Sequence, residues 1–533
     1  MKADERIVVV GGGLAALRAA ERFRELGFAG ELTIVGAERY RPYHRPALSK
    51  QILSGELRLR DLGLESYVEL DATWRFGTPA LRVDPARHVV ELPGAEELRY
   101  DGLVIATGVE PRHMPGAPRH DPRVHVLRTL RDAVAVQRNL RAGHGPVVVI
   151  GGGFTACELA STVRDLGREV TIVSRSKVLC GRVFGRELGE RIGDLHRKHG
   201  VKLAMGAEVT HWMPQSWGLG LYLNTGQLIV ADCVILAVGS VPTVQWLRGS
   251  GLVTEDGVLC RPSCHVQGAS DIVAAGDVAR WPNLRFEAVP RRVEHWINAV
   301  EMGRAAAESL LAGPTEAKPF TPLPRFWTEQ HGVRLQAAGM PTLGQDTIRL
   351  TGKEGKRGVI GQVRGGRLIG VVGWDSPRSI IRWTAELERE LRRPWTSSQP
   401  IIPADLADPA DETVSISRRE PEPEPEPGFV FDDPIDAEAA QLSAEANLRP
   451  NNRSNGTSGY FEALSEQLAE AERNGGPGVP FGPPPTARSA EPTGRFAPPT
   501  GRGGGSGGFR PARQQQLNEW QASKLERDEI RLN

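Results

Sequence analysis

The sequence predicts an α/β fold with two similar parallel-sheet domains, a small α+β domain after them and a disordered tail. A short apolar run, a glycine-rich turn and a helical pattern follow one another twice in the chain, each time with a further apolar run behind them. A strand, a crossover helix and a second parallel strand form the unit from which doubly wound sheets are built. Beyond about residue 395, Pro, Glu, Gly, Ser and Arg replace the aliphatic clusters, which is typical of disorder.

The first unit begins with Ile7–Val10, an apolar run that indicates a buried parallel strand. Three glycines at 11–13 follow, then a helical pattern from about Leu14 to Leu26 and a second strand at Leu32–Val35. The second unit repeats this order, with strands at Val147–Ile150 and Val170–Val173, glycines at 151–153 and a helix ending near Leu166.

The remaining elements follow from the same patterns. Gly102–Ile105 and Ile272–Ala274 are short and apolar, and we expect both to be strands. Two alternating stretches on either side of Gly365-Gly366 predict a hairpin, with arms at Val359–Val363 and Leu368–Val372. The last folded element is expected to be a helix over Ser379–Leu391.

Charge is distributed unevenly along the chain. Residues 396–533 hold 13 Lys and Arg against 22 Asp and Glu, a net charge of −9 that leaves +10 on residues 1–395. The Glu-Pro run at residues 420–427 predicts extended chain, and residues 460–468 have the spacing of a short, transient helix. A basic body suits an acidic partner, and an evenly solvated surface is the other interpretation.

Cysteine usage and hydropathy exclude several classes of protein. Five cysteines, Cys157, Cys180, Cys233, Cys260 and Cys264, form neither a metal-ligand pattern nor a C-x-x-C pair, so no metal site is expected. An odd and sparse set favours a reducing cytoplasm. No apolar stretch approaches the roughly eighteen residues of a membrane helix, and the first apolar run is too short for a signal peptide. We therefore expect a cytoplasmic protein without membrane insertion.

The pattern Gly11-x-Gly13-x-x-Ala16 lies directly between a predicted strand and a predicted helix. Its first glycine permits the tight turn, its second lets the backbone approach a pyrophosphate, and the small third residue lets helix and strand pack closely. The amino end of the helix then faces the phosphates. Glu38, just past the second strand, is placed to accept hydrogen bonds from ribose hydroxyls. These features predict a Rossmann-type dinucleotide-binding domain.

The same pattern returns as Gly151-x-Gly153-x-x-Ala156, again between a strand and a helix. Two such units in one chain are far more specific than one, because a purely structural explanation needs two independent coincidences. Two dinucleotide sites imply two cofactors, and hydride transfer from one to the other is their simplest use. Asp277 follows another predicted strand, where it suits the ribityl hydroxyls of a flavin or serves as a turn aspartate.

Together these residues resemble the flavoproteins related to glutathione reductase, which contain two dinucleotide-binding domains. Within them the sequence is similar to the ferredoxin, rubredoxin and putidaredoxin reductase group. Residues 45–50 read R-P-A-L-S-K against that group's R-P-P-L-S-K, residues 294–299 read E-H-W-I-N-A against E-H-W-x-N-A, and residues 326–330 read F-W-T-E-Q against F-W-S-D-Q. The resemblance covers about residues 5–392 and omits the tail.

The resemblance implies the site residue by residue. Lys50 is expected beside the reactive face of the flavin and Glu158 opposite it, and these two are the predicted catalytic residues. Trp327 is expected near the isoalloxazine, with an ordinary core tryptophan as the alternative. The residues expected to contact FAD are Gly11, Gly13, Ala16, Glu38, Arg45, Lys50, Ala80, Ala106, Arg128, Asp277, Trp296 and Trp327. Those expected to bind the nicotinamide coenzyme are Gly151, Gly153, Phe154, Thr155, Ser174, Arg175, Lys177 and Gly239.

The implied domains are an FAD-binding domain at residues 1–113 and 240–318, an inserted NAD(P)H-binding domain at 114–239, a C-terminal domain at 319–395 and the tail at 396–533. Disulfide-reducing relatives carry a C-x4-C pair on the helix beneath the flavin, roughly where Ala47–Ile52 stands here. This chain has no cysteine before Cys157. A dithiol step needs two thiols within bonding distance, so disulfide reduction of that type is excluded.

We therefore expect an enzyme that passes electrons from NAD(P)H through FAD to a ferredoxin-type iron–sulfur protein, which serves an oxygenase such as a cytochrome P450. No nucleic-acid partner is expected. Two alternatives remain open: an NAD(P)H oxidase that uses a small oxidant, and a redox-sensing flavoprotein resembling apoptosis-inducing factor.

The choice of coenzyme depends on the residues after Val173. Relatives commonly end this strand in an acid that holds the ribose hydroxyls of NADH, whereas this chain continues Ser174-Arg175-Ser176-Lys177. A guanidinium can grip a 2′-phosphate, which predicts a preference for NADPH over NADH. Solvated loop charges are the alternative interpretation.

Overall fold

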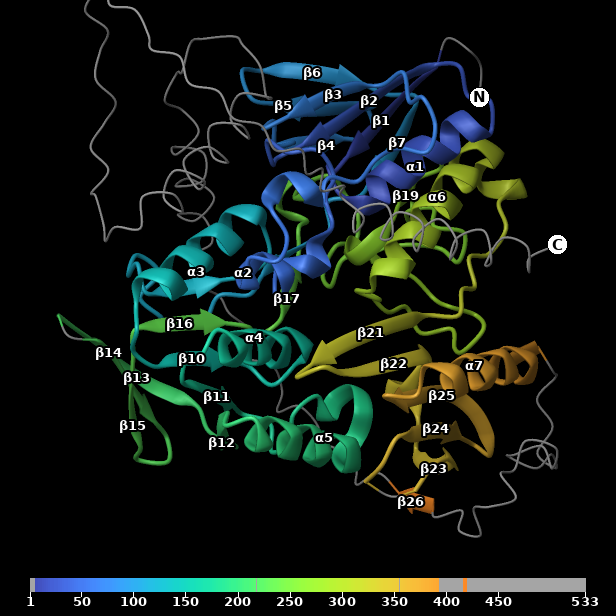
Figure 1. The fold of residues 1–533 in the computed structure, drawn as a ribbon. Helices are drawn as coiled ribbons and strands as arrows, with labels where there is room; N and C mark the ends of the chain where they lie inside the picture. Colours follow the sequence, from blue (N-terminus) through green and yellow to red (C-terminus); the bar gives the residue numbers. More distant parts are fainter. Residues whose placement is uncertain (1–4, 217, 354, 393–415, 419–533) are drawn as a thin grey trace, which may run out of the picture. The chain divides into compact units, whose positions relative to one another are not determined.

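Two parallel sheets and one antiparallel sheet organise the chain (Figure 1). The computed structural model describes residues 5–216, 218–353, 355–392 and 416–418, which all belong to one compact unit, Met1–Glu470. No helix in this part of the chain has the length and apolarity needed to cross a membrane.

The first sheet is parallel and five-stranded, with the apolar strand β1 at its centre. Helix α1 (Leu14–Glu25) leads from β1 to β2 and packs against α6 (Trp296–Glu316). Gly303 on α6 permits this close approach, because a Cβ there would lie 2.4 Å from the backbone oxygen of Ala15. The strands in spatial order are β19 (Ile272–Ala274), β7 (Gly102–Ile105), β1 (Arg6–Val10), β2 (Glu31–Gly36) and β3 (Thr73–Phe76).

The second sheet repeats this architecture around β10. Its helices are α3 (Leu130–Ala142), α4 (Phe154–Asp165) and α5 (Gly181–Lys198). Its strands in spatial order are β12 (Lys202–Met205), β11 (Val170–Ser174), β10 (Val147–Ile150), β16 (Cys233–Leu236) and β9 (Val124–Val126).

Short antiparallel elements join and flank the two parallel sheets. The chain passes between the sheets twice, and the two crossings pair as β8 (Val109–Pro111) and β17 (Ser240–Pro242). Two three-stranded meanders are β4 (Arg82–Asp84), β5 (Val89–Leu92) and β6 (Glu96–Arg99), and β13 (Val209–Gln215), β14 (Gly218–Leu223) and β15 (Leu228–Ala231). Further short elements include the helix α2 (Gln51–Ser54) and the parallel pair β18 (Val258–Leu259) and β20 (Ala279–Arg280).

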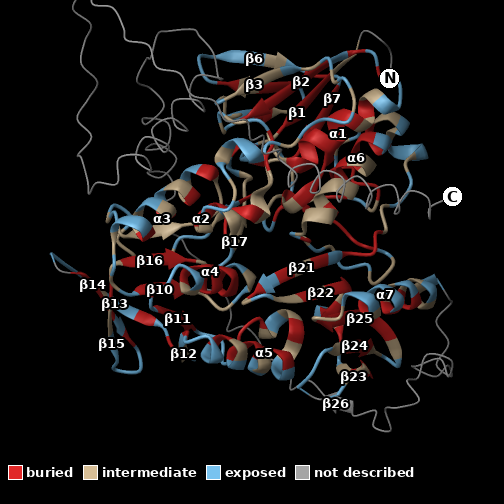
Figure 2. Cartoon of the chain, in the orientation of Figure 1, coloured by how far each residue is buried: buried red, intermediate tan, exposed pale blue. Residues whose placement is uncertain are grey.

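The C-terminal sheet is antiparallel and buries both of its faces (Figure 2). One face shares a hydrophobic core with α4 and α5, and the other packs against α7 (Pro377–Arg392), whose Trp383 and Leu387 are almost fully buried. Its strands in spatial order are β21 (Arg325–Gln330), β22 (Val333–Gly339), β25 (Arg367–Trp374), β24 (Gly358–Arg364), β23 (Asp346–Thr351) and β26 (Ile416–Arg418).

The strands and helices that the sequence predicted between residues 5 and 392 are confirmed, with small shifts at their ends. The two parallel sheets and the C-terminal sheet confirm the predicted fold class. The predicted disordered tail begins at residue 396, but Ile416–Arg418 within it pairs antiparallel with β23. The Glu-Pro run and the short helix expected at residues 460–468 lie outside the described residues.

Candidate active site

The first glycine of each turn is required by the neighbouring strand. Gly11 has φ +131°, and a Cβ there would lie 2.1 Å from the backbone oxygen of Ala106 at the end of β7. Gly151 has φ +138°, and its Cβ would lie 2.1 Å from the backbone oxygen of Ala237 after β16. Any side chain at either position would collide with backbone, so both turns need glycine to form at all.

The second glycine of each turn faces open space instead. A Cβ at Gly13 or Gly153 would meet no protein atom within 4 Å. Both residues stand at the amino ends of helices, α1 and α4, and no side chain caps either helix. Helix α3, by contrast, is capped by Thr129, whose hydroxyl accepts from the backbone N–H of Asp132. The uncapped N–H donors and the open space in front of them fit a pyrophosphate at each turn.

The small third residues pack as the pattern requires. Ala16 on α1 and Ala156 on α4 are fully buried against their sheets. Ala106 is buried beside the first turn, and its N–H donates to the backbone oxygen of Val10. Ala80 is half-buried in the loop after β3, where it packs against the core of the first sheet.

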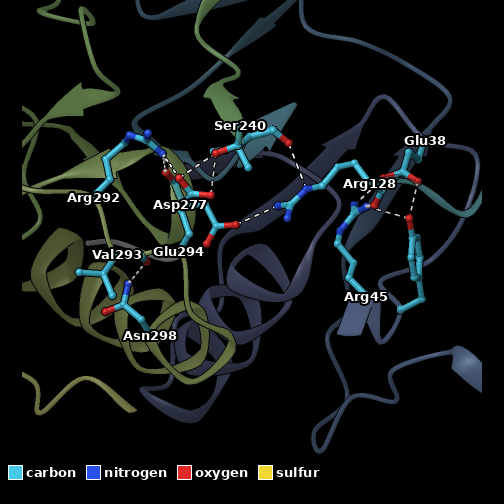
Figure 3. A network of polar contacts seen from close by, with 11 residues as sticks. Glu38, Arg45, Arg128, Ser240, Asp277, Arg292, Val293, Glu294 and Asn298 are labelled. Atoms are coloured by element: carbon cyan, nitrogen blue, oxygen red, sulfur yellow. Dashed lines mark hydrogen bonds and ion pairs between the residues drawn. The ribbon is translucent and has the colours of Figure 1, made fainter. Parts of the chain in front are cut away.

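Glu38 and Arg45 form a hydrogen-bonded pair beyond the end of β2 (Figure 3). An Arg45 nitrogen lies 2.5 Å from Glu38 Oε1, and the Tyr43 hydroxyl donates to Oε2 at 2.8 Å. Burial raises the pKa of the Tyr43 phenol, so this group remains a neutral donor. Arg45 also donates to the backbone oxygen of Arg128. Glu38 is therefore held in one orientation and keeps lone pairs available for a ligand's hydroxyl groups.

Asp277 lies at the other end of the same polar network (Figure 3). Arg128 donates to Asp277 Oδ2 at 2.8 Å. Arg292 contacts the backbone oxygen of Asp277 and donates to Glu294 at 2.6 Å, while Ser240 donates to the same carboxylate. The two acids predicted to hold sugar hydroxyls thus pair with Arg45 and Arg128, two arginines that were predicted to contact the same cofactor.

Lys50 and Glu158 form an ion pair between the two parallel-sheet regions. Lys50 Nζ lies 2.6 Å from Glu158 Oε2, and the two side chains are 20% and 11% exposed. The Ser49 hydroxyl donates to the same oxygen at 2.8 Å, and Thr328 on β21 donates to Oε1 at 2.8 Å. Lys50 comes from the segment that carries Arg45, and Glu158 lies on α4 soon after the second glycine turn. The pair therefore connects the segment that carries Arg45 to the helix that follows the second glycine turn.

The predicted aromatic residues lie in three different settings. Phe154 packs its ring 5.2 Å from Phe184 and 5.3 Å from Phe326, so its side chain supports the contact between α4 and β21. Trp296 is the first residue of α6 and meets His44 edge-on at 4.7 Å. Trp327 is half-buried, and it belongs to none of the hydrophobic clusters in the described chain. The alternative of an ordinary core tryptophan is therefore not favoured.

Three of the predicted coenzyme residues, Ser174, Arg175 and Lys177, lie at or just after the end of β11. Ser174 is buried, its hydroxyl accepts from the N–H of Ser176, and a Cβ at Gly152 would lie 2.4 Å from this oxygen. Arg175 and Lys177 are exposed and form no hydrogen bond or ion pair with another described residue. Thr155 is exposed on the first turn of α4, and Gly239 has φ +106° in the loop leading to β17.

Two cysteines that are distant in sequence come together near the site. The Cys157 and Cys180 sulfurs lie 3.7 Å apart, and all five cysteines are free and buried. The hydrogen bond to Cys180 and burial raise the pKa of the Cys157 thiol well above its ordinary value. Such buried thiols are unreactive. Across the described ranges no group of three or more His, Cys, Asp or Glu side chains is arranged to hold a metal ion.

His196 and His331 form a hydrogen-bonded pair of histidines. His196 on α5 is fully buried, and the nitrogens His196 Nδ1 and His331 Nε2 are 3.0 Å apart. Burial lowers the pKa of His196 to about 4, and burial together with His196 lowers the pKa of His331 to about 3. Both imidazoles are therefore neutral near pH 7.

Several residues of the site were missed from the sequence. Ser49, Thr328 and Gln330 lie inside two of the three motifs quoted for the resemblance, and none was assigned a role. The alternation of β21 was the available signal: Phe326, Thr328 and Gln330 are buried while Arg325 and Glu329 are exposed. No local pattern indicated that His196 reaches β21, because that contact joins residues far apart in the chain.

Known proteins are similar to this chain in both sequence and fold. The chain matches the pyridine nucleotide-disulphide oxidoreductase family over residues 5–303 and the reductase C-terminal family over residues 325–416. Rhodocoxin reductase from Rhodococcus erythropolis is 32% identical over 408 residues, which are 75% of this chain and 92% of the relative. The ferredoxin–NAD(+) reductase component of the p-cumate 2,3-dioxygenase system from Pseudomonas putida is 31% identical over 347 residues, 64% of this chain and 83% of the relative.

Among solved structures, the covalent complex of putidaredoxin reductase with putidaredoxin matches with a TM-score of 0.68 and 27% identity, over 73% of this chain and 94% of that chain. The chain therefore belongs to the pyridine nucleotide-disulphide oxidoreductase family. Its two matched regions and its relatives belong to the ferredoxin reductase group of that family. FAD and a pyridine nucleotide are accordingly its cofactors.

Gly13→Val should abolish FAD binding and leave the fold intact, because the new side chain enters the open space in front of α1 instead of protein. Absorbance of bound flavin per chain, together with far-ultraviolet circular dichroism, measures both effects. Gly153→Val is the matched control at the second turn and should keep its flavin. A folded Gly13→Val protein with full flavin content would show that this turn does not bind the flavin cofactor.

Stability should fall as the pH drops from about 6.5 towards 4, because the unfolded chain protonates His196 near pH 6.5 and the folded chain only near 4. Between pH 7 and pH 5 this difference in pKa should lower the free energy of unfolding by about 2 kcal/mol. Urea unfolding at both pH values should show a smaller loss in His196→Gln than in the wild type. Equal losses in the two proteins would mean that the His196 pKa is not depressed.

Proposed function

We propose that this protein is an FAD-dependent reductase that passes electrons from NAD(P)H to a ferredoxin-type iron–sulfur protein. One observation carries the proposal: the Lys50–Glu158 ion pair joins the flavin-side network to the helix of the coenzyme turn. Relatives named as ferredoxin–NAD(+) reductase components of dioxygenase systems, and the complex of a related reductase with its redoxin, support the same function. An oxygenase is the proposed final user of the electrons.

FAD, when bound, accepts a hydride and gives up the electrons one at a time. The chain's own residues position it. We assign Glu38 and Asp277 to the sugar hydroxyls, and the uncapped turns at Gly13 and Gly153 to the two pyrophosphates. Trp296 and Trp327 are assigned to the ring region, with Lys50 as the charged hydrogen-bond donor beside it. Glu158 pairs with Lys50 from the coenzyme side.

The three sheets support a division of the chain into three functional regions. We propose that residues 1–113 and 240–318 bind FAD, that residues 114–239 bind the coenzyme, and that residues 319–395 cover the flavin. The β8–β17 pair lies where the chain crosses between the first two of these regions. Because β26 pairs with β23, the third region extends to Arg418. The five buried, free cysteines support a reducing compartment, and we propose the cytoplasm.

Ferredoxin reduction should slow as ionic strength rises, because an acidic partner is steered to the basic body by charges that salt screens over about 10 Å at 0.1 M. Turnover of a panel of ferredoxins at increasing salt measures this effect. A chain ending at Arg418 keeps β26, so it should retain the wild-type rate of flavin reduction. Rapid oxygen consumption with no turnover of any ferredoxin would contradict the proposed function and indicate an oxidase.

We further propose that NADPH is preferred over NADH. Arg175 and Lys177 are exposed at the end of β11 without a protein partner among the described residues, and Ser174 stands where an acid is common. The relatives' names specify NAD(+) and favour the opposite choice. The local chemistry supports the proposal, since a guanidinium suits a 2′-phosphate and a serine, not a carboxylate, stands at the end of β11.

Arg175→Ala should reduce the preference for NADPH about tenfold, if the guanidinium contributes about 1.4 kcal/mol to binding. The change should appear in KM more than in kcat, because the 2′-phosphate is remote from the hydride. Steady-state kinetics with both coenzymes on the variant and the wild type gives the ratio. A wild type that favours NADH, or a ratio unchanged by the substitution, contradicts the assignment.

A further inference from the structure

Both oxygens of the Glu158 carboxylate are occupied by protein donors. Oε2 accepts hydrogen bonds from Lys50 and Ser49, and Oε1 accepts one from the hydroxyl of Thr328. Glu158 is 9% exposed and Thr328 is fully buried. The orientation of this carboxylate therefore depends on a hydroxyl supplied by the C-terminal sheet.

The hydroxyl of Thr328 is the first link of a longer chain of hydrogen bonds. Its only hydrogen is donated to Glu158, so its oxygen can accept, and the Gln330 amide nitrogen lies 3.3 Å from it. The amide oxygen of Gln330 then faces His196 Nε2 at 3.1 Å. An amide oxygen cannot donate, so His196 carries its hydrogen on Nε2.

This tautomer leaves His196 Nδ1 as an acceptor, and His331 Nε2 donates to it at 3.0 Å. His331 is fixed in turn, because its backbone N–H donates to Ser161 on α4 at 2.7 Å and its ring stacks on His199 with centroids 4.2 Å apart. From His331 to Glu158 every donor points the same way, towards the carboxylate.

Each link is defined by burial as well as by distance. Thr328, Gln330 and His196 are all fully buried, where an unpaired polar group is costly. Aligned hydrogen bonds in such surroundings strengthen one another. Since the links come from α4, β21, the turn after β21 and α5, the arrangement fixes Glu158 from two sheets at once.

We propose that Thr328, Gln330 and His196 are positioning residues that orient Glu158 towards Lys50. The inference rests on the proposed function, in which Lys50 lies beside the flavin. None of the three residues needs to touch a cofactor, because each acts through the next.

Thr328→Val tests the first link, since it removes the hydroxyl and keeps the shape. Flavin reduction at saturating NADPH should slow about tenfold, the effect expected from losing a hydrogen bond to a charged group, with coenzyme KM unchanged. Thr328→Ser keeps the hydroxyl and should restore the rate. Gln362→Met is the control, because Gln362 is an equally buried glutamine of the same sheet outside the chain of bonds.

A second readout does not depend on turnover. In the wild type, nitrogen NMR of labelled histidines should show His196 protonated only at Nε2, and in Thr328→Val the freed Gln330 amide should allow both tautomers. If Thr328→Val fails to fold, His196→Gln and His196→Leu take its place. The glutamine of His196→Gln retains an N–H that reaches Gln330, so flavin reduction should be faster in this variant than in His196→Leu.

Lys50→Met separates failure of the inference from failure of the proposed function. Slow flavin reduction in Lys50→Met and in Thr328→Val supports both. Slow reduction in Lys50→Met with the wild-type rate and a single His196 tautomer in Thr328→Val overturns the inference alone. Wild-type rates in both variants overturn the role of Lys50 and the inference with it.

Discussion

The contact between Lys50 and Glu158 is the interaction on which the site depends. An ion pair this far removed from water is costly unless its geometry is good and its remaining lone pairs are satisfied. Here the nitrogen and oxygen lie 2.6 Å apart, and the hydroxyls of Ser49 and Thr328 complete the carboxylate's contacts. The pair joins two segments of the chain, and Thr328 adds a contact from the C-terminal sheet. Removing either partner therefore affects the alignment of the regions as well as the local charge.

The two glycine turns were predictable because their geometry is local. A strand, a glycine with positive φ and a helix without a side-chain cap follow one another within a few residues, and both copies show the same collision at the first glycine and the same space at the second. Glu38 and Asp277 were placed by the same reasoning. Their pairing with Arg45 and Arg128 was not foreseen: no periodic pattern marks the Glu38–Arg45 pair, and the Arg128–Asp277 pair joins segments 149 residues apart.

The support behind Glu158 illustrates what the sequence could not reveal. Thr328 and Gln330 are two residues apart on one strand, so their shared face was predictable, but their partners on α4 and α5 lie more than a hundred residues earlier. The same holds for Cys157 and Cys180, which showed no spacing pattern and yet lie in contact. Tertiary packing determines these contacts, and single-sequence periodicity does not record it.

A crystal structure of the FAD-loaded protein tests the central claim most directly. The account predicts that the Lys50–Glu158 pair is retained and that Lys50 Nζ lies within hydrogen-bond reach of the flavin ring, about 2.6–3.2 Å from a ring heteroatom. An isoalloxazine bound away from Lys50, with the ion pair unchanged, would contradict it.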